Sequence, residues 1–138
     1  ADDDGFYDVQ KNPAQLNGRA AVRTDADGCF HVFGAVPSAY PIPNDGTVGH
    51  MLKAQGRHPY RPAHVHFMIA APGCETLVTH LFLSDSDYLD SDVVFGVKDS
   101  LIESVVRAEP GLTRYGAKLD APMPALRHDF VLADARAF

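Results

Sequence analysis

Apolar and polar side chains alternate in several short stretches of this chain, a pattern typical of strands. The clearest stretch is residues 63–70, where His64 and His66 fall on one face and large apolar side chains on the other. Pro62 suits the start of this strand because it lacks a backbone N–H and fixes its own φ. The same kind of pattern predicts further strands at residues 29–33, 77–83 and 130–133.

Turn signals and one helical pattern connect these strands. Residues 25–28 and 71–73 carry the Asp, Pro and Gly residues that favour turns. Apolar positions recur at helical spacing in residues 48–55, just before Gly56, so a short helix is expected ahead of the histidine strand. Residues 101–107 fit either a helix or a strand. The elements together predict a mainly β fold with short helices in loops.

Length and composition favour one compact domain over residues 1–138. The chain has 138 residues, 46% of them hydrophobic, and shows no linker, repeat or low-complexity tract. Its formal net charge of −6 argues against nucleic acid as a partner, because phosphate binding calls for a basic surface. No apolar run is long enough to span a bilayer and no charged-then-apolar leader opens the chain, so no membrane partner is expected.

The two cysteines, Cys29 and Cys74, give one candidate disulfide, but neither belongs to a C-x-x-C or zinc-ligand spacing. We interpret both as free, buried thiols, as is usual in a reducing compartment. The cysteine usage therefore fits a cytoplasmic enzyme.

Four aspartates resemble a calcium-binding loop: Asp85, Asp87, Asp90 and Asp92. The glycine and the terminal bidentate glutamate that an EF-hand requires are missing from this stretch. A solvated acidic loop is the better interpretation, since charge-rich loops usually face water.

His64 and His66 are candidate metal ligands, because residues i and i+2 of a strand share a face and both imidazoles could reach one ion. Such a pair alone is weak support, since many strand histidines only bond to their neighbours. Two tyrosines, Tyr7 and Tyr40, strengthen the metal interpretation. A phenol has an ordinary pKa of about 10, so it binds as phenolate at neutral pH only to a strongly Lewis-acidic ion such as Fe(III).

Five segments make the chain resemble the intradiol ring-cleaving dioxygenases. They are DGFYDVQ, YPIP with the following DG and VG, GRHPYRPAHVHF, LVTHLF and YLDSDVVFGVKDSLI, and they run in family order along nearly the whole chain. The resemblance is closest to the hydroxyquinol 1,2-dioxygenase branch, with catechol- and chlorocatechol-type enzymes as close competitors. It implies an antiparallel β-sandwich catalytic domain and favours a strand over residues 101–107.

The resemblance also assigns roles to site residues. It makes Tyr7, Tyr40, His64 and His66 the four protein ligands of a non-haem Fe(III) ion, with His66 across the metal from Tyr40. Tyr40 matches the tyrosine that leaves the metal when substrate binds and then accepts a substrate proton. Arg61 matches a catalytic arginine beside the substrate. A guanidinium stays cationic, which suits a site where negative charge develops.

Substrate contacts are implied for Ile42, Pro43, Val94 and His80, in addition to Arg61. Core packing is the alternative for the three apolar residues. His80 stands where catechol- and protocatechuate-type relatives usually carry glutamine. It is expected to be a donor near Arg61 in the hydroxyquinol branch, and the alternative is a strand histidine bonded to a neighbour.

The implied reaction is cleavage of benzene-1,2,4-triol (hydroxyquinol) by O₂ between its adjacent hydroxylated carbons. The product would be 3-hydroxy-cis,cis-muconate, which tautomerises to maleylacetate. Two alternatives stay open: a catechol or chlorocatechol 1,2-dioxygenase, and a non-catalytic metal-binding or interaction module with a β-sandwich fold. Because the chain begins almost inside the first motif, we expect it to be the catalytic portion of a family that dimerises through a helical N-terminal region; a homodimer is one expected assembly.

Overall fold

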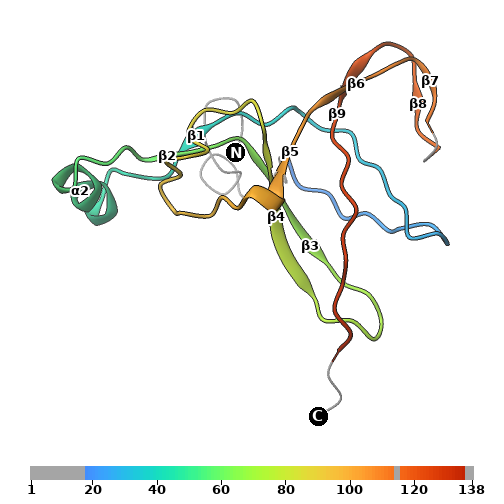
Figure 1. The fold of residues 1–138 in the computed structure, drawn as a ribbon, viewed down its shortest axis with the longest axis horizontal. Coiled ribbons are helices and arrows are strands. Elements are labelled where there is room, and N and C mark those ends of the chain that lie inside the picture. Colours follow the sequence, from blue (N-terminus) through green and yellow to red (C-terminus); the bar gives the residue numbers. More distant parts are fainter. Residues whose placement is uncertain (1–17, 114–115, 136–138) are drawn as a thin grey trace. The chain divides into compact units, whose positions relative to one another are not determined.

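A computed structural model describes residues 18–113 and 116–135 of the chain (Figure 1). Tyr7 lies outside these residues. The chain divides into two compact units, which are described separately below: Ala1–Pro37 with Val105–Ala125, and Ser38–Ser104 with Leu126–Phe138. None of the helices among the described residues has the length and apolar character that a membrane crossing requires.

The second unit contains most of the regular structure. Its elements are β1 (Tyr40–Pro41), α2 (Thr47–Ala54), β2 (Tyr60–Arg61), β3 (His64–Ile69), β4 (Leu77–Leu83), η1 (Asp99–Leu101) and β5 (Ile102–Glu103). Strands β1 and β2 form an antiparallel pair, and β3, β4 and β5 form a sheet with β4 in the centre. The β3–β4 pair is antiparallel, whereas β4 and β5 run parallel.

The β3–β4 hairpin confirms the strands predicted at residues 63–70 and 77–83 (Figure 1). The predicted turn between them also forms, since the N–H of Cys74 donates to the carbonyl of Ala71 at 3.1 Å. Gly73 has a φ of 79°, which an L side chain rarely adopts and glycine accepts without strain. In this register His64 faces Phe82 and His66 faces His80, so that both histidines share one side of the sheet.

The predicted helix is confirmed as α2, which joins β1 to β2. Its buried positions are Gly49 and Leu52. A Cβ built on Gly49 would lie 1.7 Å from the carbonyl oxygen of Asn44, so only glycine fits there. Gly56, with a φ of 65°, follows the helix and turns the chain toward β2.

The core of this unit lies at the end of β4. Leu81, Phe82 and Leu83 are 1%, 0% and 3% exposed. The face of β3 that carries Phe67 is opposite to the face that carries the two histidines. The C-terminal segment covers part of it, because the ring of Phe130 packs 4.9 Å from that of Phe67. These contacts hold the histidine-bearing strand from both sides.

In the first unit, two antiparallel pairs are formed by β6 (Val106–Ala108) with β9 (Met123–Ala125) and by β7 (Gly111–Leu112) with β8 (Lys118–Leu119). The predicted turn at residues 25–28 is present. The Asp25 carboxylate accepts the N–H groups of Asp27 and Cys29 at 3.0 and 2.8 Å. Asp25 therefore stabilises the turn with its own side chain.

Two predicted strands are wrong. Residues 29–33 follow their turn without a strand ladder in the part of the chain that the structure describes, although their side chains alternate. Residues 130–133 form no strand either. Their neighbourhood makes one isolated bridge, Cys74 with Asp134, and the N–H of Glu75 donates to the carbonyl of Ala133. Alternation shows which side chains share a face, but a strand also needs a partner backbone.

Other expectations hold in part. Residues 101–107 end the short helix η1 and then enter β5 and β6, so a strand is present there but interrupted. The parallel β4–β5 pair departs from the antiparallel arrangement predicted for the fold. A mainly β chain with few helices is confirmed, and the sandwich and the single domain stay predictions. Both cysteines are free, but they are half-buried rather than buried.

Candidate metal and substrate site

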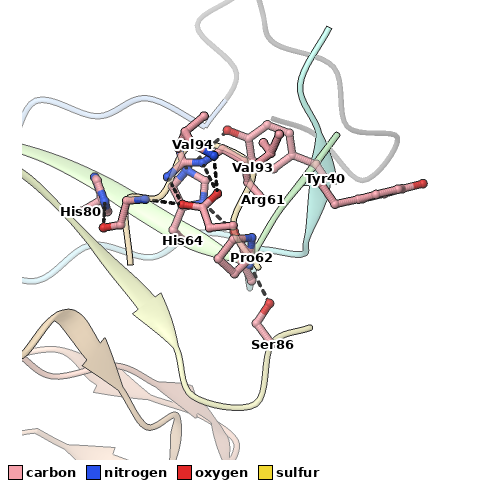
Figure 2. A network of polar contacts seen from close by, with 12 residues as sticks. Tyr40, Arg61, Pro62, His64, His80, Ser86, Val93 and Val94 are labelled. Carbon is pink, nitrogen blue, oxygen red and sulfur yellow. Dashed lines mark hydrogen bonds and ion pairs between the residues drawn. The ribbon is translucent and has the colours of Figure 1, made fainter. Parts of the chain in front are cut away.

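Polar side chains from three strands converge where β3 begins. Strand β1 places Tyr40 opposite Arg61 of β2, and His64 opens β3 directly after Ala63. All three side chains are buried, with exposed fractions of 7% for Tyr40, 7% for Arg61 and 8% for His64. In the view of Figure 2, Arg61 and His64 lie between Tyr40 and His80. Buried polar groups in such a cluster require hydrogen-bond partners, and each of these three side chains has at least one.

Three potential metal donors meet around the Nε2 atom of His64. The hydroxyl oxygen of Tyr40 lies 3.4 Å from it, and the Nε2 atom of His66 lies 3.2 Å from it. No group of three or more His, Cys, Asp or Glu side chains in the described ranges could hold a metal ion. Tyrosine is not among those four residue types. The finding therefore does not bear on a metal site formed by tyrosine and histidine together.

The backbone before β3 sets the orientation of the His64 ring. Its Nδ1 atom lies 2.6 Å from the carbonyl oxygen of Pro62. A carbonyl oxygen only accepts, so the Nδ1 atom carries the proton and the lone pair of the neutral ring is on Nε2. A metal-ligating histidine is usually fixed in this way, by a hydrogen bond from its other ring nitrogen.

The surroundings of both histidines of β3 favour the neutral form, although His64 is buried and His66 is exposed. Burial, aided by the positive charge of Arg61 and by His66 and His80, lowers the pKa of His64 from 6.5 to about 4, although the bond to Pro62 works in the opposite direction. The pKa of His66 is also lowered, first by burial and then by His80 and Arg61. At neutral pH both rings are therefore uncharged, and the Nε2 lone pair of His64 accepts a hydrogen bond from Nη1 of Arg61 at 3.0 Å.

Arg61 forms a two-point ion pair with Asp92. The Nε atom lies 3.1 Å from Oδ1 and the Nη2 atom lies 3.3 Å from Oδ2. Asp92 is 3% exposed, so the solvated-loop interpretation is wrong for this residue, while Asp85, Asp87 and Asp90 are exposed as expected. Burial opposes ionisation of Asp92, but bonds from Arg61, Gly96 and Val94 outweigh it and hold its pKa below the usual range.

Gly96 lies between Arg61, Asp92 and His80. Its N–H donates to Oδ2 of Asp92 at 2.8 Å, and its carbonyl oxygen lies 3.3 Å from Nε2 of His80. Arg61 and His80 therefore flank the same glycine, as expected if His80 is a neighbour of the arginine. Sequence reasoning missed both Asp92 and Gly96. One signal was available: of the four loop aspartates, only Asp92 is followed directly by three apolar residues, Val93, Val94 and Phe95.

The residues expected beside the substrate differ in exposure. Ile42 is half-buried, and its N–H donates to the carbonyl of Pro59 at 2.9 Å. Pro43 is exposed, and Val94 is 47% exposed. Core packing, the alternative for these residues, therefore does not account for Pro43 and Val94.

A family model described as Dioxygenase matches residues 1–134. Hydroxyquinol 1,2-dioxygenase of Nocardioides simplex is 49% identical over 98% of this chain and 46% of the relative. The chain belongs to the intradiol dioxygenase family. The 6-chlorohydroxyquinol 1,2-dioxygenase of Cupriavidus pinatubonensis (strain JMP 134 / LMG 1197) is 56% identical over 83% of this chain and 42% of that protein.

A solved family structure shares the fold. Hydroxyquinol 1,2-dioxygenase from Pseudomonas putida DLL-E4 superposes with a TM-score of 0.86 and 47% identity, over 96% of this chain and 47% of that one. Relatives named catechol and chlorocatechol 1,2-dioxygenase are more distant in sequence. The chain spans about half the length of the curated relatives it matches.

Proposed function

We propose that the protein containing this chain is a non-haem Fe(III) intradiol dioxygenase that cleaves hydroxyquinol with O₂. One observation supports this most strongly: the donor atoms of Tyr40, His64 and His66 converge beside a buried arginine. The names of the relatives described above support the substrate class, because hydroxyquinol enzymes match this chain better than catechol enzymes do.

The separations of the Tyr40 and His66 donor atoms from His64 support ligation of one ion. Two ligands about 2.1 Å from a metal, at an angle between a right angle and a tetrahedral one, lie about 3.0–3.4 Å apart. The observed separations from His64 Nε2 are 3.4 Å to the Tyr40 oxygen and 3.2 Å to His66 Nε2. A phenolate and neutral imidazoles suit Fe(III), and Tyr7 is proposed as the fourth protein ligand.

Fe(III), when bound, supplies a strong Lewis acid that lowers the pKa of substrate hydroxyls and attracts the diol as a dianion. The bond from its Nδ1 atom to the Pro62 carbonyl fixes the His64 ring, so its Nε2 atom faces Tyr40, His66 and Arg61. Tyr40, whose hydroxyl oxygen lies 3.4 Å from His64 Nε2, would be one ligand of the ion and is proposed to accept a proton of the substrate. The Nη1 atom of Arg61 lies 3.0 Å from His64 Nε2. In this position the guanidinium is proposed to stabilise negative charge that develops on the aromatic ring of the substrate.

The surrounding residues are proposed to orient the triol. Ile42, Pro43 and Val94 would contact the ring, and His80 would present a polar group near Arg61. Apolar contacts of this kind change binding by only about 1–3 kcal/mol per methylene or hydroxyl, so they set ring orientation more than strict selectivity. The proposed product is 3-hydroxy-cis,cis-muconate, which tautomerises to maleylacetate.

The test is turnover by the iron-loaded protein. We expect O₂ uptake matched by loss of benzene-1,2,4-triol and formation of maleylacetate, with catechol a slower substrate. His64→Ala should abolish uptake, and His50→Ala, at an exposed histidine of α2, should leave it unchanged. Extradiol products, or equal uptake by His64→Ala and the wild type, would contradict the proposal.

A further inference from the structure

We propose that Asp92 is a positioning residue that holds the Arg61 guanidinium so that its Nη1 edge faces the metal and substrate. The inference rests on the proposed function, in which Arg61 acts on the substrate. It concerns a residue 31 positions away from Arg61 in the sequence, in the loop between β4 and η1. The ion pair between them is the observation that carries the argument.

The geometry of a guanidinium makes this assignment specific. The group is planar and has its N–H donors in a fixed fork. Asp92 contacts Nε and Nη2, at 3.1 and 3.3 Å, so both bonds lie along one edge of the plane. Fixing that edge fixes the direction of the remaining nitrogen. Nη1 is the nitrogen that lies 3.0 Å from His64 Nε2.

Asp92 is itself fixed by the backbone that follows it. Its Oδ2 atom accepts the N–H of Gly96 at 2.8 Å and its Oδ1 atom accepts that of Val94 at 3.4 Å. Its own carbonyl accepts the N–H of Phe95 at 2.9 Å. The carboxylate is thus part of a closed turn, held by backbone donors of that turn in addition to Arg61.

Two further bonds attach this turn to β2 and to the segment that precedes it. The N–H of Val93 donates to the carbonyl of Tyr60 at 3.1 Å, and Nη2 of Arg57 donates to the carbonyl of Val93 at 2.8 Å. The turn therefore keeps a constant position relative to β2. A rigid support of this kind gives the arginine a defined direction before substrate arrives.

Asp92 therefore acts on turnover through Arg61. Replacing it leaves the guanidinium present but free to rotate away from the reacting atoms. A displacement of about 1 Å can lower a rate by about 100-fold. We therefore expect kcat to fall by about 10- to 100-fold in Asp92→Ala, less in Asp92→Asn, with a smaller change in KM. Iron content and the visible tyrosinate band should stay unchanged in both variants.

The decisive comparison uses the iron-loaded protein and four variants. Asp90→Asn, at an exposed position of the same loop, is the matched control and should keep wild-type kcat. In an Arg61→Ala background, Asp92→Ala should cause no further loss of kcat, because its effect passes through the arginine. Equal fold-losses in the presence and absence of Arg61 would overturn the proposal.

A second readout does not depend on turnover. The side chain of Arg61 is 8% exposed, whereas that of Arg107 is 73% exposed. Phenylglyoxal should label Arg61 slowly in the wild type and several-fold faster in the Asp92 variants, with labelling of Arg107 constant. Asp92→Asn, which keeps the side-chain shape, serves if Asp92→Ala fails to fold.

Unchanged labelling of Arg61 in a folded Asp92 variant would overturn the proposal whether or not the protein cleaves the triol. A wild-type protein that shows slow Arg61 labelling but no triol cleavage would instead refute the proposed function alone. The two claims can therefore fail separately.

Discussion

Gly96→Ala should disturb the site without removing any functional group. A Cβ at this position would lie 3.1 Å from Nη2 of Arg61, 3.1 Å from Oδ2 of Asp92 and 3.3 Å from Nε2 of His80, whereas ordinary contacts lie at 3.4–4 Å. The backbone of Gly96 does not have the left-handed φ that side chains avoid, so in the folded state the added methyl group acts only through its steric contacts.

The magnitude follows from what must move. Arg61 and Asp92 are joined at 3.1 and 3.3 Å, so relieving one contact lengthens an ion-pair bond. Overpacking a filled site costs about 1–3 kcal/mol, and replacing glycine by alanine returns about 0.4–1 kcal/mol through the unfolded chain. We expect a net loss on the order of 1–2 kcal/mol in the free energy of unfolding.

Urea unfolding measures this loss directly. With a denaturant slope of about 2 kcal/mol per molar, the midpoint should fall by about 0.5–1 M. Gly34→Ala is the control, because a Cβ there meets nothing within 4 Å, and its midpoint should stay constant or rise slightly. Equal midpoints for Gly96→Ala and the wild type would refute the close packing on which the argument depends.

Four other substitutions test separate parts of the structure. Phe82→Ala removes a side chain that is 0% exposed and should lower the free energy of unfolding by about 3–5 kcal/mol, which urea unfolding would show; a loss under about 1 kcal/mol would mean that Phe82 is not in the core. His64→Ala should lose iron, whereas His80→Ala should retain it, because the Nε2 atom of His80 contacts the Gly96 carbonyl. Metal analysis of the two variants measures the difference, and equal iron retention would argue against His64 as a ligand. Tyr40→Phe should shift the visible band and reduce kcat more than it reduces iron content, and an unchanged spectrum would exclude Tyr40 from the metal.

The elements that were predictable from the sequence depend on neighbours close in the chain. Strand β3 carries its alternation and its starting proline within a few residues, and α2 carries its spacing and its terminal Gly56 in the same way. The turn at residues 71–73 follows from the backbone preferences of proline and glycine. These features need no knowledge of distant segments.

The features that were not predictable depend on distant partners. Residues 29–33 alternate as a strand does, yet an alternating segment becomes a strand only where another backbone pairs with it. Asp92 looks like its acidic neighbours until Arg61, 31 positions earlier, is folded against it. The convergence of Tyr40 and His64, 24 positions apart, is likewise a product of the β1–β2 pairing.

The central claim is that Tyr40, His64 and His66 belong to a ferric site open to a diol. Iron analysis and a visible spectrum of the purified protein, repeated after anaerobic addition of benzene-1,2,4-triol, test it most directly. We predict about one iron per chain and a broad tyrosinate-to-iron band that moves when the triol binds. A protein that stays colourless after ferric reconstitution, or whose band ignores the triol, would contradict it.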